Sequence, residues 1–369
     1  MSLDHYYLLG RSGLRVSRIA LGTMNFGTGG FHAAYGRTAE EARPIFRHYL
    51  EAGGNFIDTA DFYTAGESET ILGDLIAEAG VRDRVVLTTK FTNSVAPGDP
   101  NAGGNGRKHM IRAVEASLRR LRTDYIDLFL LHTWDRITPV EEVMRTFDDL
   151  TRAGKIRYAG LSDVPSWYAA RAQTLAEANS LVPVVSLQLP YSLVSRTIEL
   201  EHIAMGQSLG LGITAWSPLG GGFLTGKYRH TGQGLAGEGR LAGSGSPGRS
   251  WTDREWQLLA TLETVADKLG MTMAQVALNW VATQPGVASA IIGASSTEQL
   301  DANLSALDVE LPAELRAKLD EASSVPPPSV YQMFTPGYQN WLVSSGAKVG
   351  DKPAGYAPAV RNWVAESRD

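Results

Sequence analysis

The sequence predicts an α/β fold, a closed (β/α)₈ TIM barrel, from two observations. Short apolar or β-branched runs alternate with amphipathic stretches along the chain, which is typical of a parallel sheet built from βα units. Eight such runs are present, and eight repeats favour a closed barrel over an open, doubly wound sheet. We expect one domain over residues 1–369, because barrels routinely exceed the usual domain length, with the barrel at about 17–310.

The eight expected strands are residues 19–22, 56–58, 85–90, 126–132, 158–162, 184–189, 212–216 and 288–293. Between them, apolar residues recur at helical spacing, as in Ile111, Val114 and Leu118, in Val143, Phe147 and Leu150, and in Leu262, Val265 and Leu269. Pro139 fits the first position of the fourth helix, where its missing N–H costs nothing, and Ala153-Gly154 fits the helix end.

Three segments lie outside the repeat. Residues 6–16, with a Gly-Arg-Ser-Gly turn, predict an N-terminal β-hairpin. Residues 96–107 and 232–248 are rich in Gly, Pro and Ser and predict long loops on the face that carries the active site. The C-terminal tail, 324–369, carries Tyr331, Phe334, Tyr338 and Trp341. These aromatic residues suggest that the tail packs back on the barrel, either over the pocket or as ordinary surface docking.

Composition excludes several classes of function. Lys+Arg 34 against Asp+Glu 39 gives a net charge of -5, and the basic residues are scattered, so no nucleic-acid or anionic-lipid surface is indicated. With no cysteine there can be no disulfide, thiolate metal site or cysteine nucleophile. No apolar stretch reaches the roughly 18 residues of a membrane helix. We therefore expect a cytoplasmic protein with a small-molecule substrate; the oligomeric state stays open.

Several short motifs are chance matches. Residues 232–237 and 243–248 both fit G-x-G-x-x-G, but neither lies directly between a strand and a helix, as a dinucleotide site requires. Residues 221–227 have the spacing of a phosphate-binding loop, but Tyr228 stands where the magnesium-binding Ser or Thr belongs. The seven His residues include no His-Glu-x-x-His motif, so we predict no metal.

Polar residues end three consecutive predicted strands, which is where barrel enzymes place their active sites. Asp58 ends the second strand and Tyr63 follows it, Lys90 ends the third, and His132 ends the fourth. Singly, a strand-end Asp is often a helix cap, a Lys usually reaches water, and a His is more often a hydrogen-bonded core residue. Together, on adjacent strands, they indicate a catalytic site.

These four residues suit reduction of a carbonyl group, which needs a hydride on carbon and a proton on oxygen. Tyr63 is the candidate acid, with an ordinary pKa of about 10. A Lys90 ammonium ~4 Å away would stabilise tyrosinate by roughly 4 kcal/mol and lower that pKa by about three units, less the cost of burial. Asp58 would keep Lys90 charged and oriented. A neutral His132 can donate a hydrogen bond to the same oxygen.

Motifs in a fixed order carry a family resemblance. They are LGTMNFG (21–27), NFIDTADFY (55–63), TK (89–90), LLH (130–132), GLSD (160–163), WSPLG (216–220) and IGASS (292–296). Over residues 6 to about 310 the chain thereby resembles the aldo-keto reductase superfamily, and its aryl-alcohol dehydrogenase-like branch in particular. The resemblance implies that Asp58, Tyr63, Lys90 and His132 form the catalytic tetrad and that NADPH, with NADH as the alternative, binds without a Rossmann fold.

The same resemblance implies the cofactor contacts. Ser162, Asp163 and Gln188 would hold the nicotinamide carboxamide, and Trp216 would stack on the ring, although a packing role for this Trp is about as common. The remaining expected contacts are Gly22, Thr23, Met24, Asp58, Ser217, Pro218, Leu219, Gly222, Lys227, Arg240, Gly293, Ser295, Gln299 and Asn303. Gly293 and Ser295 precede a helix beginning near Thr297, whose N-terminus favours an anion.

Two positions depart from the family pattern. Asp163 stands where many members have Asn, so it can accept but not donate a hydrogen bond; Asp here is similar to the aryl-alcohol dehydrogenase-like branch. Residues 294–302 contain no Lys or Arg, although many members bind the 2′-phosphate with a basic residue there. Lys227 and Arg240 are the alternative sources of positive charge.

The leading hypothesis is an NADPH-dependent reductase of aldehydes or ketones. Aromatic substrates are favoured by Phe26, Trp134, Tyr191 and Phe223 near the active face, with Phe26, Tyr63, His132 and Trp134 as the substrate contacts. Two alternatives stay open: an NAD(P)-dependent alcohol or sugar dehydrogenase, and a cofactor-binding regulatory subunit of the kind that potassium-channel β subunits represent within this family.

Overall fold

A computed structural model of the protein describes residues 3–30, 35–231, 234–237, 239, 241, 251–345 and 347. Eight parallel strands form a closed barrel in the order β12-β3-β4-β5-β6-β7-β8-β9. They are β3 (Ile19–Gly22), β4 (Phe56–Asp58), β5 (Val86–Phe91), β6 (Ile126–Leu131), β7 (Ile156–Ser162), β8 (Val184–Pro190), β9 (Gly212–Trp216) and β12 (Val287–Ile292). The (β/α)₈ barrel predicted from the sequence is confirmed, with strand limits within two residues of those expected.

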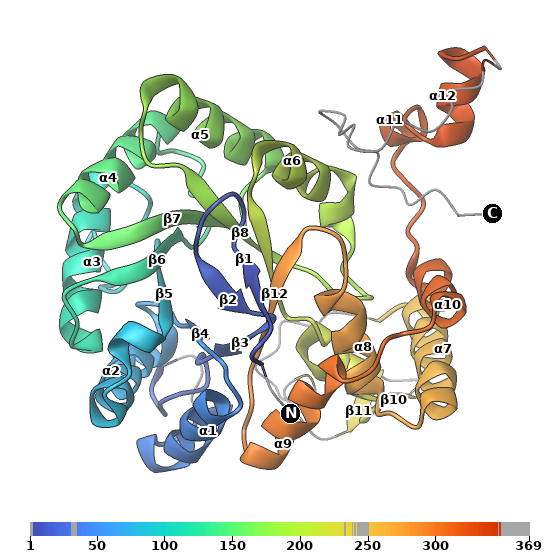
Figure 1. Ribbon diagram of the computed structural model, residues 1–369, viewed down its shortest axis with the longest axis horizontal. Helices are drawn as coiled ribbons and strands as arrows, with labels where there is room; N and C mark the ends of the chain where they lie inside the picture. Colours follow the sequence, from blue (N-terminus) through green and yellow to red (C-terminus); the bar gives the residue numbers. More distant parts are fainter. Residues whose placement is uncertain are drawn as a thin grey trace.

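Helices surround the barrel, and α1 to α6 each follow one strand (Figure 1). The helices are α1 (Ala39–Glu51), α2 (Glu67–Ala79), α3 (Arg107–Leu121), α4 (Val140–Arg152), α5 (Ser166–Asn179), α6 (His202–Leu209), α7 (Asp253–Leu269), α8 (Met273–Ala282), α9 (Thr297–Leu304), α10 (Ala313–Ser323), α11 (Ser329–Gln332) and α12 (Pro336–Leu342). Helix α8 packs on β12, whereas α7 and α10 pack on each other beside it. Pro139 is the N-cap of α4 rather than its first helical residue.

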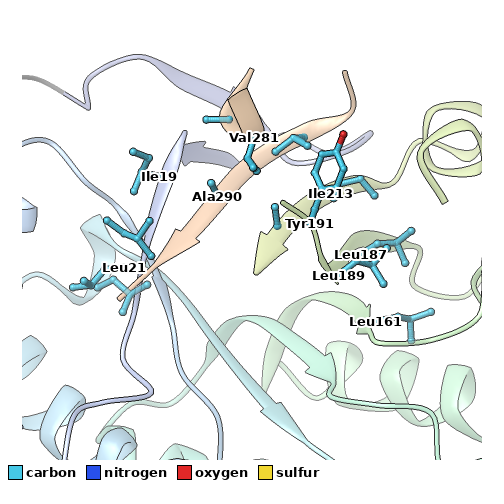
Figure 2. Close-up of a cluster of buried hydrophobic side chains, with 14 of the residues drawn as sticks. Ile19, Leu21, Leu161, Leu187, Leu189, Tyr191, Ile213, Val281 and Ala290 are labelled. Atoms are coloured by element: carbon cyan, nitrogen blue, oxygen red, sulfur yellow. The ribbon is translucent and has the colours of Figure 1, made fainter. Parts of the chain in front are cut away.

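The core has two parts because side chains of a barrel strand alternate between the interior and the helices. Inside the barrel, Phe56, Leu128 and Val185 are buried in one cluster. The antiparallel hairpin β1 (Tyr6–Leu8) and β2 (Arg15–Ser17) brings Leu9 and Val16 to that cluster, so the predicted hairpin lies against the barrel interior. Between strands and helices lies a larger cluster, part of which, including Leu21, Leu161, Ile213 and Ala290, is shown in Figure 2.

One of the two predicted long loops differs from expectation in its described residues, while 232, 233, 238, 240 and 242–248 lie outside them. Part of the predicted loop 232–248 is a strand, β11 (Gly234–Gly237), which pairs antiparallel with β10 (Tyr228–Thr231). Gly237 permits the close approach of this strand to Tyr228. Because glycine has a low β propensity, the sequence of this segment did not predict a strand. The segment 96–107 is a loop up to Gly106, after which α3 begins.

The described part of the tail contacts the surface of the barrel, which is one of the two placements that the sequence left open. Helix α12 lies apart from the barrel in Figure 1. Phe334, Tyr338 and Trp341 are 57%, 38% and 68% exposed. Tyr331 does reach the barrel, because its hydroxyl donates to Glu201 Oε1 at 2.5 Å. The aromatic residues instead contact each other in pairs, Tyr331 with Phe334 and Tyr338 with Trp341.

Candidate active site

The four predicted catalytic residues meet at the carboxyl ends of neighbouring strands. Asp58 is the last residue of β4, and it pairs in register with Gly22 of β3 and Thr88 of β5. Lys90 lies two residues further along β5, and His132 directly follows β6. Tyr63 begins the short 3₁₀ helix η2 (Tyr63–Gly66), in which Thr64 and Ala65 have positive φ. This tight turn brings the phenol back over the barrel mouth.

Lys90 organises the group. Its ammonium is fully buried and donates three hydrogen bonds, to Asp58 Oδ1 at 2.6 Å, to Thr59 O at 2.8 Å and to the Tyr63 hydroxyl at 3.2 Å. All three N–H groups of the ammonium thus have acceptors, as a buried charge requires. The second oxygen of Asp58 accepts from Gln188 Nε2 at 2.8 Å.

Electrostatics in this group differ from the sequence-based expectation at Tyr63. Burial raises the pKa of the Tyr63 hydroxyl above 10, and the Lys90 ammonium offsets only part of this rise. Lys90 lowers the pKa of the phenol, as predicted, but the cost of burial that the prediction left open is larger, so the net direction of the pKa is upward. Burial also lowers the pKa of Lys90, but Asp58 and Tyr63 outweigh it, so that pKa is raised.

His132 is neutral. Burial, followed by the charge of Lys90, holds the pKa of the imidazole well below its ordinary value of 6.5. Its ring packs edge-on against Tyr63, with 5.8 Å between centroids, and against Phe62, with 5.3 Å. A neutral imidazole keeps one N–H to donate and one nitrogen to accept, which is the state that the sequence analysis required.

A cavity of about 540 Å³ opens beside the tetrad, and Asp58, Tyr63 and His132 line it. Residues predicted to contact the cofactor that also line it are Gly22, Met24, Ser162, Asp163, Gln188, Trp216, Ser217, Pro218, Leu219, Gly222, Lys227, Gly293, Ser295 and Gln299. The structure therefore gathers most of the predicted contacts, from six strand ends and the loop after β9, around one cavity.

Some predicted site residues do not line the cavity. Thr23 is fully buried, and its hydroxyl donates to Asp58 O at 3.1 Å. It therefore holds the backbone at the end of β4. Asn303 is buried in α9. Arg240 lies outside the described residues. The predicted substrate contact Phe26 is fully buried in the outer core, so that prediction needs correction. Trp134 is partly buried and packs against Trp167 and Tyr168, and its contact with substrate stays a prediction.

The proposed aromatic character of the pocket also needs revision. Tyr191 is buried and packs on Trp280, and its hydroxyl donates to Glu199 Oε1 at 2.7 Å; Figure 2 shows it among core side chains. Phe223 is fully buried and stacks on Trp251. Tyr191 and Phe223 are close in sequence to loops of the active face, but their side chains are buried in the hydrophobic core. The direction in which a side chain points cannot be read from its distance in sequence to a loop.

The cavity includes residues that the sequence analysis missed. They are Asn25, Tyr35, Phe62, Gly221, Thr225, Gly239, Ile291, Ile292 and Ala294. Phe62 lies between two motif residues, and its ring is 5.2 Å from that of Tyr63 between centroids. Its position within the motif NFIDTADFY, directly before Tyr63, is the sequence feature that could have identified it. Arg37 was missed as well. Its Nε donates to the carbonyl of Ser295 at 3.3 Å, and Ser295 lines the cavity.

The residues present fit a nicotinamide cofactor. Ser162 Oγ is buried without a hydrogen-bond partner in the described structure, and Ser162 lines the cavity beside Gln188. A buried hydroxyl is rarely left unpaired, so it suits a polar ligand such as a carboxamide. Trp216 lines the same wall, and its Nε1 donates to Asp163 Oδ1 at 3.0 Å, which fixes the plane of the indole.

Two other kinds of site, a membrane-spanning helix and a cluster of metal ligands, are not found in the described residues. Within them no helix is long and apolar enough to cross a membrane. The same part of the chain contains no group of three or more His, Cys, Asp or Glu side chains placed to hold a metal ion.

Comparison with known proteins identifies the class. The family model for the aldo/keto reductase family matches residues 18–324. The chain belongs to this family, and it is an NAD(P)H-dependent oxidoreductase.

The chain is similar to relatives that carry three different kinds of name. A norsolorinic acid reductase of Emericella nidulans is 37% identical over 84% of this chain and 79% of its own length. An aryl-alcohol dehydrogenase of Pestalotiopsis microspora is 33% identical over 84% of this chain and 79% of its own length. A probable voltage-gated potassium channel subunit beta of Oryza sativa subsp. japonica is 35% identical over 82% of this chain and 91% of its own length. The resemblance to the aryl-alcohol dehydrogenase-like branch is thereby confirmed.

Proposed function

We propose that the protein reduces an aldehyde or ketone to the alcohol with NADPH, and that Tyr63 donates the proton. The observation that carries this proposal is the Tyr63 hydroxyl, held 3.2 Å from Lys90 Nζ in the wall of a cavity that His132 also lines. Bound NADPH would supply a hydride from its dihydronicotinamide ring to the carbonyl carbon. The protein must then orient the carbonyl, exclude water and deliver the proton.

Tyr63 is suited to act as the acid. Because burial raises its pKa, the hydroxyl keeps its proton at neutral pH until a stronger base is present. An alkoxide developing on the substrate is such a base, and the tyrosinate left behind would be stabilised by the adjacent Lys90 ammonium. The raised pKa of Lys90 keeps this charge in place. His132 donates a second hydrogen bond to the same oxygen.

The nicotinamide end has matching donors and acceptors. Since the Gln188 amide nitrogen donates to Asp58, its carbonyl oxygen is the atom that faces a carboxamide N–H. Ser162 Oγ offers a hydroxyl to the same group. The indole of Trp216, fixed by Asp163, provides a flat apolar surface for the ring. A nicotinamide ring bound against this indole would keep its opposite face for the substrate.

We infer NADPH rather than NADH from two cations, Lys227 and Arg37. Lys227 lines the cavity, and Arg37 contacts the backbone of Ser295, which also lines it. Ser296 caps α9 there, and Gln299 Oε1 accepts from Ser295 N and Oγ at 2.7 and 2.8 Å. A helix N-terminus with a nearby cation such as Arg37 favours an additional phosphate.

The proposed substrates are carbonyl compounds with an apolar or aromatic body. Phe62 takes the place that Phe26 was predicted to hold, because it lines the cavity in contact with both Tyr63 and His132. Aromatic side chains pack favourably on aromatic ligands. A cytoplasmic location remains part of this proposal.

The test is the variant Tyr63→Phe, assayed by NADPH absorbance on a panel of aldehydes and ketones that includes a nitrobenzaldehyde. We expect kcat to fall by about 10²- to 10⁴-fold, the usual contribution of a general acid, while the Kd for NADPH stays nearly unchanged. Tyr7→Phe is the matched control, since Tyr7 lies on the hairpin β1. Full activity of Tyr63→Phe, or loss of NADPH binding instead of turnover, would refute the assigned role.

The same panel separates the alternatives. Tight NADPH binding without turnover on any carbonyl would favour a cofactor-binding regulatory subunit, the role that the name of the Oryza relative describes for that protein. Faster alcohol oxidation with NAD than carbonyl reduction with NADPH would favour a dehydrogenase.

A further inference from the structure

Asn93 contacts the ring of His132 on the side away from its functional nitrogen. It lies in the loop after β5, three residues beyond Lys90, and its Nδ2 is 3.2 Å from His132 Nδ1. An amide nitrogen can only donate, so Nδ1 accepts, and the single proton of a neutral imidazole is then on Nε2. Within the described residues His132 Nε2 makes no hydrogen bond to the protein, and His132 lines the cavity.

We propose that Asn93 is a positioning residue that fixes the neutral tautomer of His132 with its proton on Nε2. The proposal rests on the role that the proposed function gives to His132. Nε2–H can donate to a carbonyl oxygen, whereas the other tautomer would present a lone pair to that oxygen and repel it. Asn93 thereby selects the form of the ring that assists proton delivery from Tyr63.

The loop that carries Asn93 is held by its own hydrogen bonds. Thr92, one residue before it, has φ +126°, a backbone conformation that a β-branched residue rarely adopts. Its Oγ1 donates to Asn105 Oδ1 at 2.6 Å and accepts from His132 N at 3.2 Å. This strained residue therefore sits in a fixed frame and directs the following side chain toward the imidazole.

The frame extends to the segment after β6. Asn105 Nδ2 donates to Thr133 O at 3.0 Å, and Asn105 N donates to Asp135 Oδ2 at 2.8 Å. The loops after β5 and β6 are thus joined on both sides of the contact between Asn93 and His132. Because burial and Lys90 keep His132 neutral, the choice to be made is between two neutral tautomers.

The direct test is ¹⁵N NMR of protein labelled at histidine, with the His132 signals assigned by their loss in His132→Asn. We expect a protonated Nε2 and an unprotonated Nδ1 in the unaltered protein. In Asn93→Leu, which keeps the volume but removes the donor, both nitrogen shifts should move toward the average of the two tautomers. Asn101→Leu, an exposed position of the same loop, should leave the spectrum unchanged.

Kinetics provide a second readout. Loss of one neutral hydrogen bond should lower kcat of Asn93→Leu by about 3- to 10-fold and leave the Kd for NADPH unchanged. Asn93→Asp should behave differently, because a carboxylate accepts from Nδ1–H and favours the imidazolium. The charged and titratable groups facing the ring are Lys90 of β5 and Tyr63 of η2. In Asn93→Asp the pKa of His132 should be higher than in the unaltered protein. The activity of this variant should therefore fall as pH rises through that pKa, a dependence absent from the unaltered protein.

A protonated Nδ1 in the unaltered protein would overturn the proposal, as would an Asn93→Leu spectrum identical to the original. Equal kinetic losses in the Leu and Asp variants without a new pH dependence would reduce Asn93 to a packing role and also overturn it. The NMR result does not depend on turnover, so an inactive protein would contradict the proposed function while leaving the assignment of the tautomer to be judged by its spectrum.

Discussion

At the scale of single residues, the site depends on charges that the protein has removed from water. Lys90 carries its ammonium with no exposure at all because three acceptors surround it. Removing one partner of such a group leaves a buried charge unpaired, which costs several kcal/mol. Asp58 consequently supports folding of the barrel mouth as well as the proposed chemistry.

Asp163 provides a prediction at this scale. Burial raises the pKa of its carboxyl from 3.8 to about 6, against the hydrogen bond from Trp216. The folded state thus disfavours the ionised form, so the Asp163 contribution to stability is lost as pH rises through about 6. Asp163→Asn keeps an acceptor for the indole N–H and removes this loss. We expect it to gain up to about 3 kcal/mol over the original protein above pH 6 and almost nothing near pH 4.

Urea unfolding of both proteins at the two pH values measures this difference. Asp124→Asn serves as the control because Asp124 is exposed. A stability difference that is the same at both pH values would show that ionisation of Asp163 carries no such cost.

At the scale of elements, the close approach of α2 and α3 depends on Gly73. A Cβ at this position would lie 2.5 Å from Arg120 O and 2.7 Å from Leu121 C. Alanine is the better helix former by about 1 kcal/mol, but the clash is with the backbone of α3, which cannot rotate away. We expect the clash to dominate, so that Gly73→Ala lowers the free energy of unfolding by about 1–3 kcal/mol.

Gly337→Ala in α12 is the matched control, since nothing lies within 4 Å of a Cβ there. It should be neutral or slightly stabilising in the same urea unfolding experiment. Destabilisation confined to Gly73→Ala would support the packing argument, and equal effects at both glycines would contradict it.

At the scale of the whole molecule, barrel closure joins residues far apart in the chain. Gln188 and Asp58 are 130 positions apart yet form one hydrogen bond. The protein has a net charge of -5, so binding of an anionic dinucleotide depends on local cations at the cavity rather than on the overall field. Lys227 is the cation that lines the cavity in the described structure.

Cofactor preference is the prediction at this scale. Lys227→Ala should raise the Kd for NADPH by about 10- to 100-fold, the loss of one charge-assisted hydrogen bond, and the Kd for NADH much less. Titration calorimetry with both cofactors measures the ratio, and Lys268→Ala on the exposed side of α7 is the control. An equal loss for the two cofactors would place Lys227 at the shared pyrophosphate instead.

The sequence by itself determined the barrel, the strands and the order in which Asp58, Lys90 and His132 end three of them. This was possible because the alternation of apolar runs is a local property, and because parallel strands deliver their carboxyl ends to one face. Tertiary structure alone decided which way side chains point and how much water they lose. Phe26 and Tyr191 turn into the packing layer, and burial overrides Lys90 at Tyr63. Asn93 meets His132 only because two loops are tied together, a contact that no local pattern encodes.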